Sequence, residues 1–163
     1  MSCNQNGKNV AIGSVPVERI EVHEMSTLII EQNPKLIKQY EIKAGNEVVF
    51  VYLNEGETFI DAEDYDAKYL ESLVFSIPDS ITSFEKSAEE LQEINCTYSW
   101  TVISKIPEKI SKPIREGSIR GQKDSNGKWS VDINVETGHK FGGYLERQSS
   151  RGISMNKSDL SGV

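Results

Sequence analysis

The stretch between residues 114 and 135 constrains the fold of this chain more than any other feature. Asn126 and Gly127 form a pair that favours a tight hairpin turn, and apolar and polar residues alternate directly after it. Alternate side chains of a strand point to opposite faces, and four apolar residues fall on one face: Trp129, Val131, Ile133 and Val135. The residues between them are polar, so the pattern predicts a strand with one buried side and one solvent-facing side.

Two other segments also predict strands. Residues 96–103 repeat the alternation, with Cys96, Tyr98, Trp100 and Val102 on the side that we expect to be buried. The block 48–53 is apolar at every position, which predicts a central strand covered on both faces. Pro107 and Pro113 exclude a central strand in the segment that they bracket.

One helix is expected between residues 83 and 94, where Phe84, Ala88, Leu91 and Ile94 recur at helical spacing. Elsewhere, short alternating runs are separated by turn signals, which is typical of all-β proteins. The sequence therefore predicts an all-β (β-dominant) fold: an antiparallel β-sandwich or small β-barrel of about seven to eight strands with one short helix.

The length of 163 residues matches one domain with less ordered ends. Residues 1–13 are polar and rich in Asn, and we expect them to form a flexible N-terminal tether. Residues 14–147 are expected to form a single β-rich domain. Residues 148–163 are rich in Ser and Gly with isolated apolar residues, so they predict a flexible C-terminal tail.

Cys3 lies in a polar segment where a thiol has no core to join. The small residue Ser2 before it and the Asn-bearing run after it resemble the start of a mature bacterial lipoprotein, although the charged and apolar parts of a signal peptide are absent. The resemblance implies a lipid anchor at Cys3 and a place in the bacterial cell envelope or periplasm, as an outer-membrane lipoprotein. The alternative is an incidental cysteine in a disordered terminus.

The net charge of −7 argues against nucleic acid as a partner, because phosphate binding needs a dominant basic surface. No apolar run approaches the ~18 residues that a membrane-spanning helix needs. We therefore expect no nucleic-acid partner, and contact with a membrane only through an anchor at Cys3.

An acidic loop is expected after the apolar block 48–53. Calcium takes six to eight oxygen ligands, and closely spaced carboxylates on a loop can supply several of them. The candidate ligands are Asp61, Glu63, Asp64 and Asp66. Their order is not that of an EF-hand, and the alternative is a solvated acidic loop. Ca²⁺ is the one cofactor that the sequence suggests.

The aromatic residues allow two interpretations. Trp100 and Trp129 both fall on the inward register of their strands, which favours packing within the core. An open sheet face would instead create an aromatic-lined ligand cavity, and its candidate residues are Tyr98, Trp100, Trp129 and Tyr144.

The sequence contains no convincing catalytic set. There is no Gly-x-Ser-x-Gly elbow, the two histidines form no metal-binding i, i+4 pair, and Cys96 is expected in the core, where thiols are inert. We therefore predict a non-catalytic binding or interaction module of the cell envelope, with a protein or small-molecule ligand that the sequence does not identify. The alternative is a small-ligand carrier with an aromatic-lined cavity.

Overall fold

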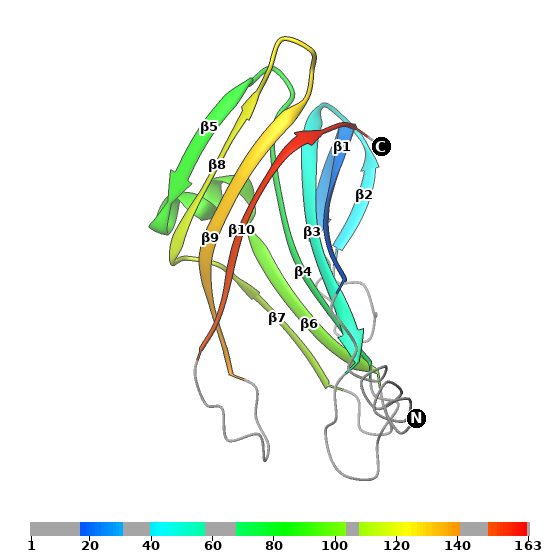
Figure 1. Cartoon of the computed structure of the whole chain (residues 1–163), viewed down its shortest axis with the longest axis vertical. Helices are drawn as coiled ribbons and strands as arrows, with labels where there is room; N and C mark the ends of the chain where they lie inside the picture. The colour runs from blue at the N-terminus through cyan, green and yellow to red at the C-terminus, as the bar shows by residue number, and fades with distance from the viewer. Residues whose placement is uncertain (1–16, 31–39, 58–67, 104–107, 141–149, 163) are drawn as a thin grey trace, which may run out of the picture.

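The protein is a sandwich of two antiparallel sheets (Figure 1). The structure, a computed structural model, describes residues 17–30, 40–57, 68–103, 108–140 and 150–162. These ranges contain ten strands and one short 3₁₀ helix, which confirms the all-β prediction with more strands than expected.

Sheet A has six strands in the order β2-β1-β3-β4-β6-β7, and sheet B has four in the order β10-β9-β8-β5. The strands of sheet A are β1 (Val17–Ile30), β2 (Tyr40–Ala44), β3 (Glu47–Glu57), β4 (Lys68–Pro78), β6 (Thr97–Ile103) and β7 (Glu108–Pro113). Those of sheet B are β5 (Ser83–Ser87), β8 (Gly117–Lys123), β9 (Trp129–Lys140) and β10 (Ser150–Leu160). The helix η1 (Ala88–Ile94) follows β5. The chain passes from sheet A to β5 of sheet B, returns to sheet A for β6 and β7, and ends in sheet B with β8, β9 and β10. In Figure 1, sheet B stands on the left and most of sheet A on the right.

The main core lies between the two sheets. Phe50 of β3 is fully buried there, stacked on Phe75 of β4 with ring centroids 5.0 Å apart. The ring of Trp129 on β9 contacts the Phe50 ring edge-on, with ring centroids 5.2 Å apart. The predicted inward residues of β9 all belong to this core: Trp129, Val131, Ile133 and Val135. The alternation therefore locates the buried face correctly.

The apolar strand β3 is buried on both sides, as its composition predicts. Its even-numbered residues, such as Phe50, join the core between the sheets. Its odd-numbered residues, such as Val49 and Val51, belong to a second cluster on the opposite face. Sheet A is thus covered on both faces in this region.

The second cluster forms because β1 folds back on itself. Its first half pairs with β3 and its second half with β2, and the register shifts at Met25, whose φ of 49° is left-handed. Tyr40 pairs with Ile30, yet it lies within electrostatic reach of Glu21. A straight strand would separate Ile30 from Glu21 by about 30 Å. The β1–β2 hairpin therefore turns over and packs against the outer face of β3 and β4.

The helix prediction for residues 83–94 is partly wrong. Residues 83–87 form β5, and only Ala88–Ile94 are helical, as a 3₁₀ helix. Phe84 pairs directly with Gly121 of β8, so its side chain joins a sheet instead of a helix face. Ser87 is the N-cap of this helix, and its backbone N–H donates a hydrogen bond to the side chain of Glu90 in a capping box.

The prediction of a flexible tail at 148–163 is wrong for Ser150–Leu160. These residues form β10, which pairs with β9, and Ile153 is buried opposite Val135. The end of the chain then reaches sheet A through a bridge between Gly162 and Val22. An edge strand can consist mostly of polar residues, because only one of its faces meets the core. The polar composition of this segment therefore predicted a tail where the structure has a strand.

Candidate binding face on sheet B

Several predicted site residues lie outside the described residues. These are the anchor candidate Cys3, the calcium candidates Asp61, Glu63, Asp64 and Asp66, and the aromatic Tyr144. Within the described ranges, His, Cys, Asp and Glu side chains form no group of three or more suited to a metal ion. The same ranges include no helix with the length and apolarity needed to cross a bilayer.

Tyr98 and Trp100 both point into the core from β6. The Tyr98 hydroxyl donates a 2.7 Å hydrogen bond to Oε2 of Glu71, a fully buried carboxylate on β4. The amide of Asn54 donates to the other oxygen of Glu71 at 3.2 Å. Trp100 stacks on Tyr69 with ring centroids 5.0 Å apart. Each of these aromatic side chains is thus packed against partners within sheet A.

Trp129 projects into the core from the other sheet. Its neighbours are Phe50 and Phe84, and the ammonium group of Lys123 lies 6.0 Å from its ring centroid. Only 1 % of Trp129 is exposed. The three described aromatic candidates belong to one core but have different ring partners, so a ligand would have to enter between the sheets to touch them.

Cys96 lies just before β6 and is a free, fully buried cysteine. Burial raises the pKa of its thiol strongly, because an apolar surrounding disfavours the thiolate. Since the thiolate is the nucleophilic form, this geometry makes Cys96 unreactive at neutral pH.

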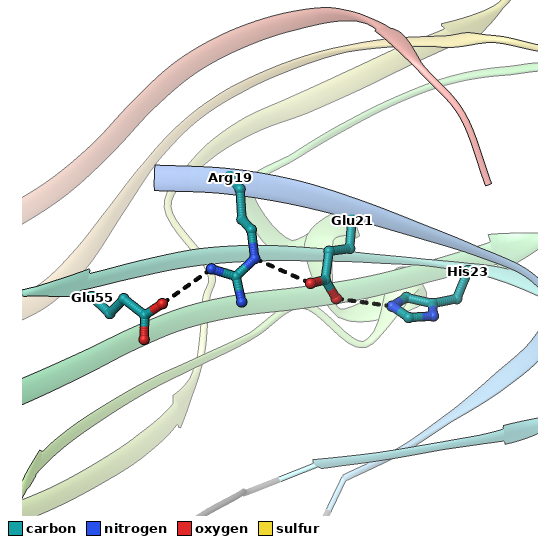
Figure 2. Close-up of polar contacts among 4 residues, drawn as sticks. All are labelled: Arg19, Glu21, His23 and Glu55. Atoms are coloured by element: carbon teal, nitrogen blue, oxygen red, sulfur yellow. Dashed lines mark hydrogen bonds and ion pairs between the residues drawn. The ribbon is translucent and has the colours of Figure 1, made fainter. Parts of the chain in front are cut away.

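A chain of polar contacts runs along the outer side of β1 (Figure 2). Arg19 donates from Nε to Glu21 and from Nη1 to Glu55 of β3, both at 3.1 Å. The other oxygen of Glu21 lies 3.1 Å from Nε2 of His23. Burial raises the pKa of Glu21, but the contacts with Arg19 and His23 outweigh it and hold the pKa below its usual value. The network links β1 to β3 next to the folded-back hairpin.

A shallow groove crosses the outer face of sheet B. It has a volume of about 660 Å³ and is lined by residues of all four strands. Its polar lining side chains are Ser83, Glu85, Arg120, Gln122, Ser130, Asp132 and Asn156. A volume of this size falls within the range of ligand sites.

The strand register explains why this lining is polar. Glu85, Arg120, Asp132 and Asn156 are aligned as successive partners across β5, β8, β9 and β10. Three apolar residues also border the groove: Phe84, Gly121 and Val131. They occupy the inward register, so they present main-chain atoms to it. The groove is therefore lined mainly by hydrogen-bonding side chains.

One ion pair lies at the centre of the groove. Arg120 contacts Oδ2 of Asp132 through Nε at 3.1 Å and through Nη2 at 3.0 Å. The Arg120 side chain is 65 % exposed, so the guanidinium is held in place while still facing solvent. A paired arginine of this kind offers further N–H donors to a ligand.

The sequence pattern does not reveal this face, because its residues carry no catalytic motif and no aromatic cluster. The available signal is the polar half of the β9 alternation, which predicts only that Ser130 and Asp132 face solvent. Their neighbours on β8 and β5 could be identified only once the register was known.

In comparisons with known proteins, no family model, no curated protein and no solved structure matches the chain.

Proposed function

We propose that this protein is a non-catalytic binding module that recognises a polar partner through the outer face of sheet B. The observation that carries the proposal is the groove of about 660 Å³, lined across four strands by polar side chains. Paired strands hold such side chains at fixed spacings, so the face is organised before a ligand arrives. The rest of sheet B supports this face by packing against sheet A.

The partner is proposed to belong to the bacterial cell envelope, with the protein anchored through Cys3. What supports this part is the Ser2-Cys3 start and the polar run that follows it. A palmitate analogue fed to the native host should label the wild-type protein and leave a Cys3→Ser variant unlabelled. Equal labelling of both proteins, or none of either, would contradict the anchor.

The small-ligand carrier is the weaker alternative. Tyr98, Trp100 and Trp129 are buried and pack against other side chains, which favours a core role for them. Acrylamide should therefore quench the fluorescence of both tryptophans only weakly in the folded protein. Strong quenching would instead support an open aromatic cavity.

A matched pair of double variants tests the binding face. Arg120→Ala/Asp132→Ala removes the ion pair in the groove, whereas Arg115→Ala/Glu89→Ala removes a comparable exposed pair elsewhere. Both are made in a Cys3→Ser background, so that no lipid anchor contributes. The readout is co-sedimentation of the purified full chain with bacterial envelope fractions.

We expect the parent and the Arg115/Glu89 variant to co-sediment alike, and the Arg120/Asp132 variant to bind at least about tenfold more weakly. Binding that is unchanged in the groove variant would contradict the proposed face. A parent protein that fails to co-sediment would contradict an envelope partner.

A further inference from the structure

We infer that the groove on sheet B binds a polyhydroxylated ligand, a glycan chain, through hydrogen bonds to its hydroxyl groups. The inference depends on the proposed function, because it names the ligand class for the same face.

The lining offers donors and acceptors side by side. Ser83, Gln122, Ser130 and Asn156 each have side chains that both donate and accept hydrogen bonds. Arg120 only donates, whereas ionised Glu85 and Asp132 only accept. A sugar hydroxyl also donates and accepts at one oxygen, so a ligand with many hydroxyls satisfies this mixed set better than one with donors alone or acceptors alone.

The groove does not fit an apolar ligand or a typical protein interface. Protein interfaces have cores enriched in aromatic residues and depleted of charge, and a few buried anchors supply most of the affinity. Here the groove is lined by three charged side chains, and the aromatic ring of Phe84 packs against Phe50 in the core. Binding must therefore come from polar contacts.

The charges of the groove also disfavour an anion. Arg120 is the one cation among the lining residues, and it is paired with Asp132. Glu85 adds a second carboxylate, and the chain as a whole carries a net charge of −7. A polyphosphate or nucleic acid would meet net repulsion at this face, whereas a neutral glycan would not.

The extent of the groove favours a chain over a single sugar. Its lining runs from β5 to β10, which is three strand spacings or about 14 Å. Side chains at both ends, Glu85 and Asn156, can therefore contact different units of one oligosaccharide. The ring of Phe84, the aromatic residue in the lining, packs against Phe50 in the core, so binding must come from hydrogen bonds and not from stacking on a sugar.

The experiment uses the full chain, labelled with ¹⁵N and titrated separately with cellohexaose, maltohexaose and chitohexaose. We expect amide shifts confined to the groove strands β5, β8, β9 and β10 for at least one of these sugars. The Arg120→Ala/Asp132→Ala variant should bind that sugar about tenfold more weakly, and the Arg115→Ala/Glu89→Ala variant should bind it as the wild type does.

Three outcomes overturn the inference. Shifts with none of the sugars, shifts on sheet A only, or equal sugar binding by the groove variant would each exclude a glycan site on this face. Failure of the inference is distinguishable from failure of the proposed function. If co-sedimentation with the envelope depends on Arg120 and Asp132 while the sugars leave the groove unperturbed, the binding module stands and only the ligand class is wrong.

Discussion

Sheets A and B differ in how many of their faces are buried. In sheet A, β3 packs against sheet B on one side and against the folded-back β1–β2 hairpin on the other. In sheet B, β9 buries Trp129 and Ile133, whereas Ser130 and Asn134, which alternate with them, are exposed. Continuous apolar sequence in β3 and strict alternation in β9 reflect this difference directly. The groove lies on the sheet that has one free face.

The two sheets also differ in whether their polar side chains are buried. Sheet A encloses the carboxylate of Glu71 and satisfies it with Tyr98 and Asn54. Glu85 and Arg120 of sheet B are exposed to solvent, where a substitution changes the free energy of unfolding little. Substitutions of these polar groups should therefore affect stability in sheet A, and on sheet B the proposed recognition.

The largest expected effect concerns the core that the sheets share. Phe50→Ala removes a fully buried ring that contacts Phe75 of sheet A and Trp129 of sheet B, and should cost about 3–5 kcal/mol. Urea unfolding followed by circular dichroism measures the loss. Ile29→Ala, at a position that is 37 % exposed, should cost less than about 1 kcal/mol. Two separate transitions in the wild type would show that the sheets unfold independently, against the shared core.

The next largest effect is the difference in stability lost when a buried and an exposed carboxylate are removed. Glu71→Ala takes away the acceptor for Tyr98 and Asn54 inside sheet A, and should destabilise the fold by about 2–4 kcal/mol. Glu85→Ala on the outer face of sheet B should change the free energy of unfolding by less than about 0.5 kcal/mol. Similar losses in both variants would remove the distinction between the sheets.

Gly117 at the start of β8 and Gly127 in the turn between β8 and β9 provide a sharper test of how these strands pair. At Gly117, with φ of 106°, an added Cβ would lie 2.3 Å from the backbone oxygen of Asn134. Gly117→Ala should therefore cost about 2 kcal/mol or more. Gly127 has φ of 81°, but its nearest neighbour would be Lys123 Cε at 3.9 Å, so Gly127→Ala should cost about 1 kcal/mol. Thermal unfolding of the two variants gives the order, and a reversed order would contradict the β8–β9 register.

The smallest effect concerns the charge network on sheet A. The folded-state pKa of Glu21 is lowered, so its carboxylate stabilises the fold above the pH at which the unfolded chain titrates, and this contribution disappears as the pH falls below about 4. Glu21→Gln should cost about 0.5 kcal/mol at pH 7 and almost nothing at about pH 3.

Urea unfolding at both pH values tests this expectation. Glu41→Gln is the control, because Glu41 contacts Lys43 at 3.9 Å and is half exposed. It should have almost no effect at either pH. A Glu21→Gln cost that grows on acidification would contradict the direction of the pKa shift.

Much of the fold could be predicted from local patterns. The alternation from Trp129 to Val135 and the apolar block 48–53 predicted which faces are buried, and the structure confirms both. The turn before β9 also follows from its residues, since the side chain of Asp124 accepts hydrogen bonds from the backbone N–H groups of Asn126 and Lys128. These features depend on residues close together in the chain.

Other features depend on partners that are distant in the chain, and the local sequence pattern predicted these features wrongly. Phe84 fits a helical spacing with Leu91 but pairs with Gly121, 37 positions further along. Ile153 stands in a Ser- and Gly-rich segment that becomes a strand because β9 provides an edge for it. The groove on sheet B has the same origin, since register alone aligns Glu85, Arg120 and Asp132.

The sequence by itself determined that this chain forms sheets, and which side of its main strands avoids water. Only the tertiary structure decided which strands are neighbours, where β1 turns back over sheet A, and which polar side chains share one surface. The physical reason is that side-chain alternation is a property of a single strand, whereas a binding face is a property of several strands whose hydrogen-bond registers bring distant residues together.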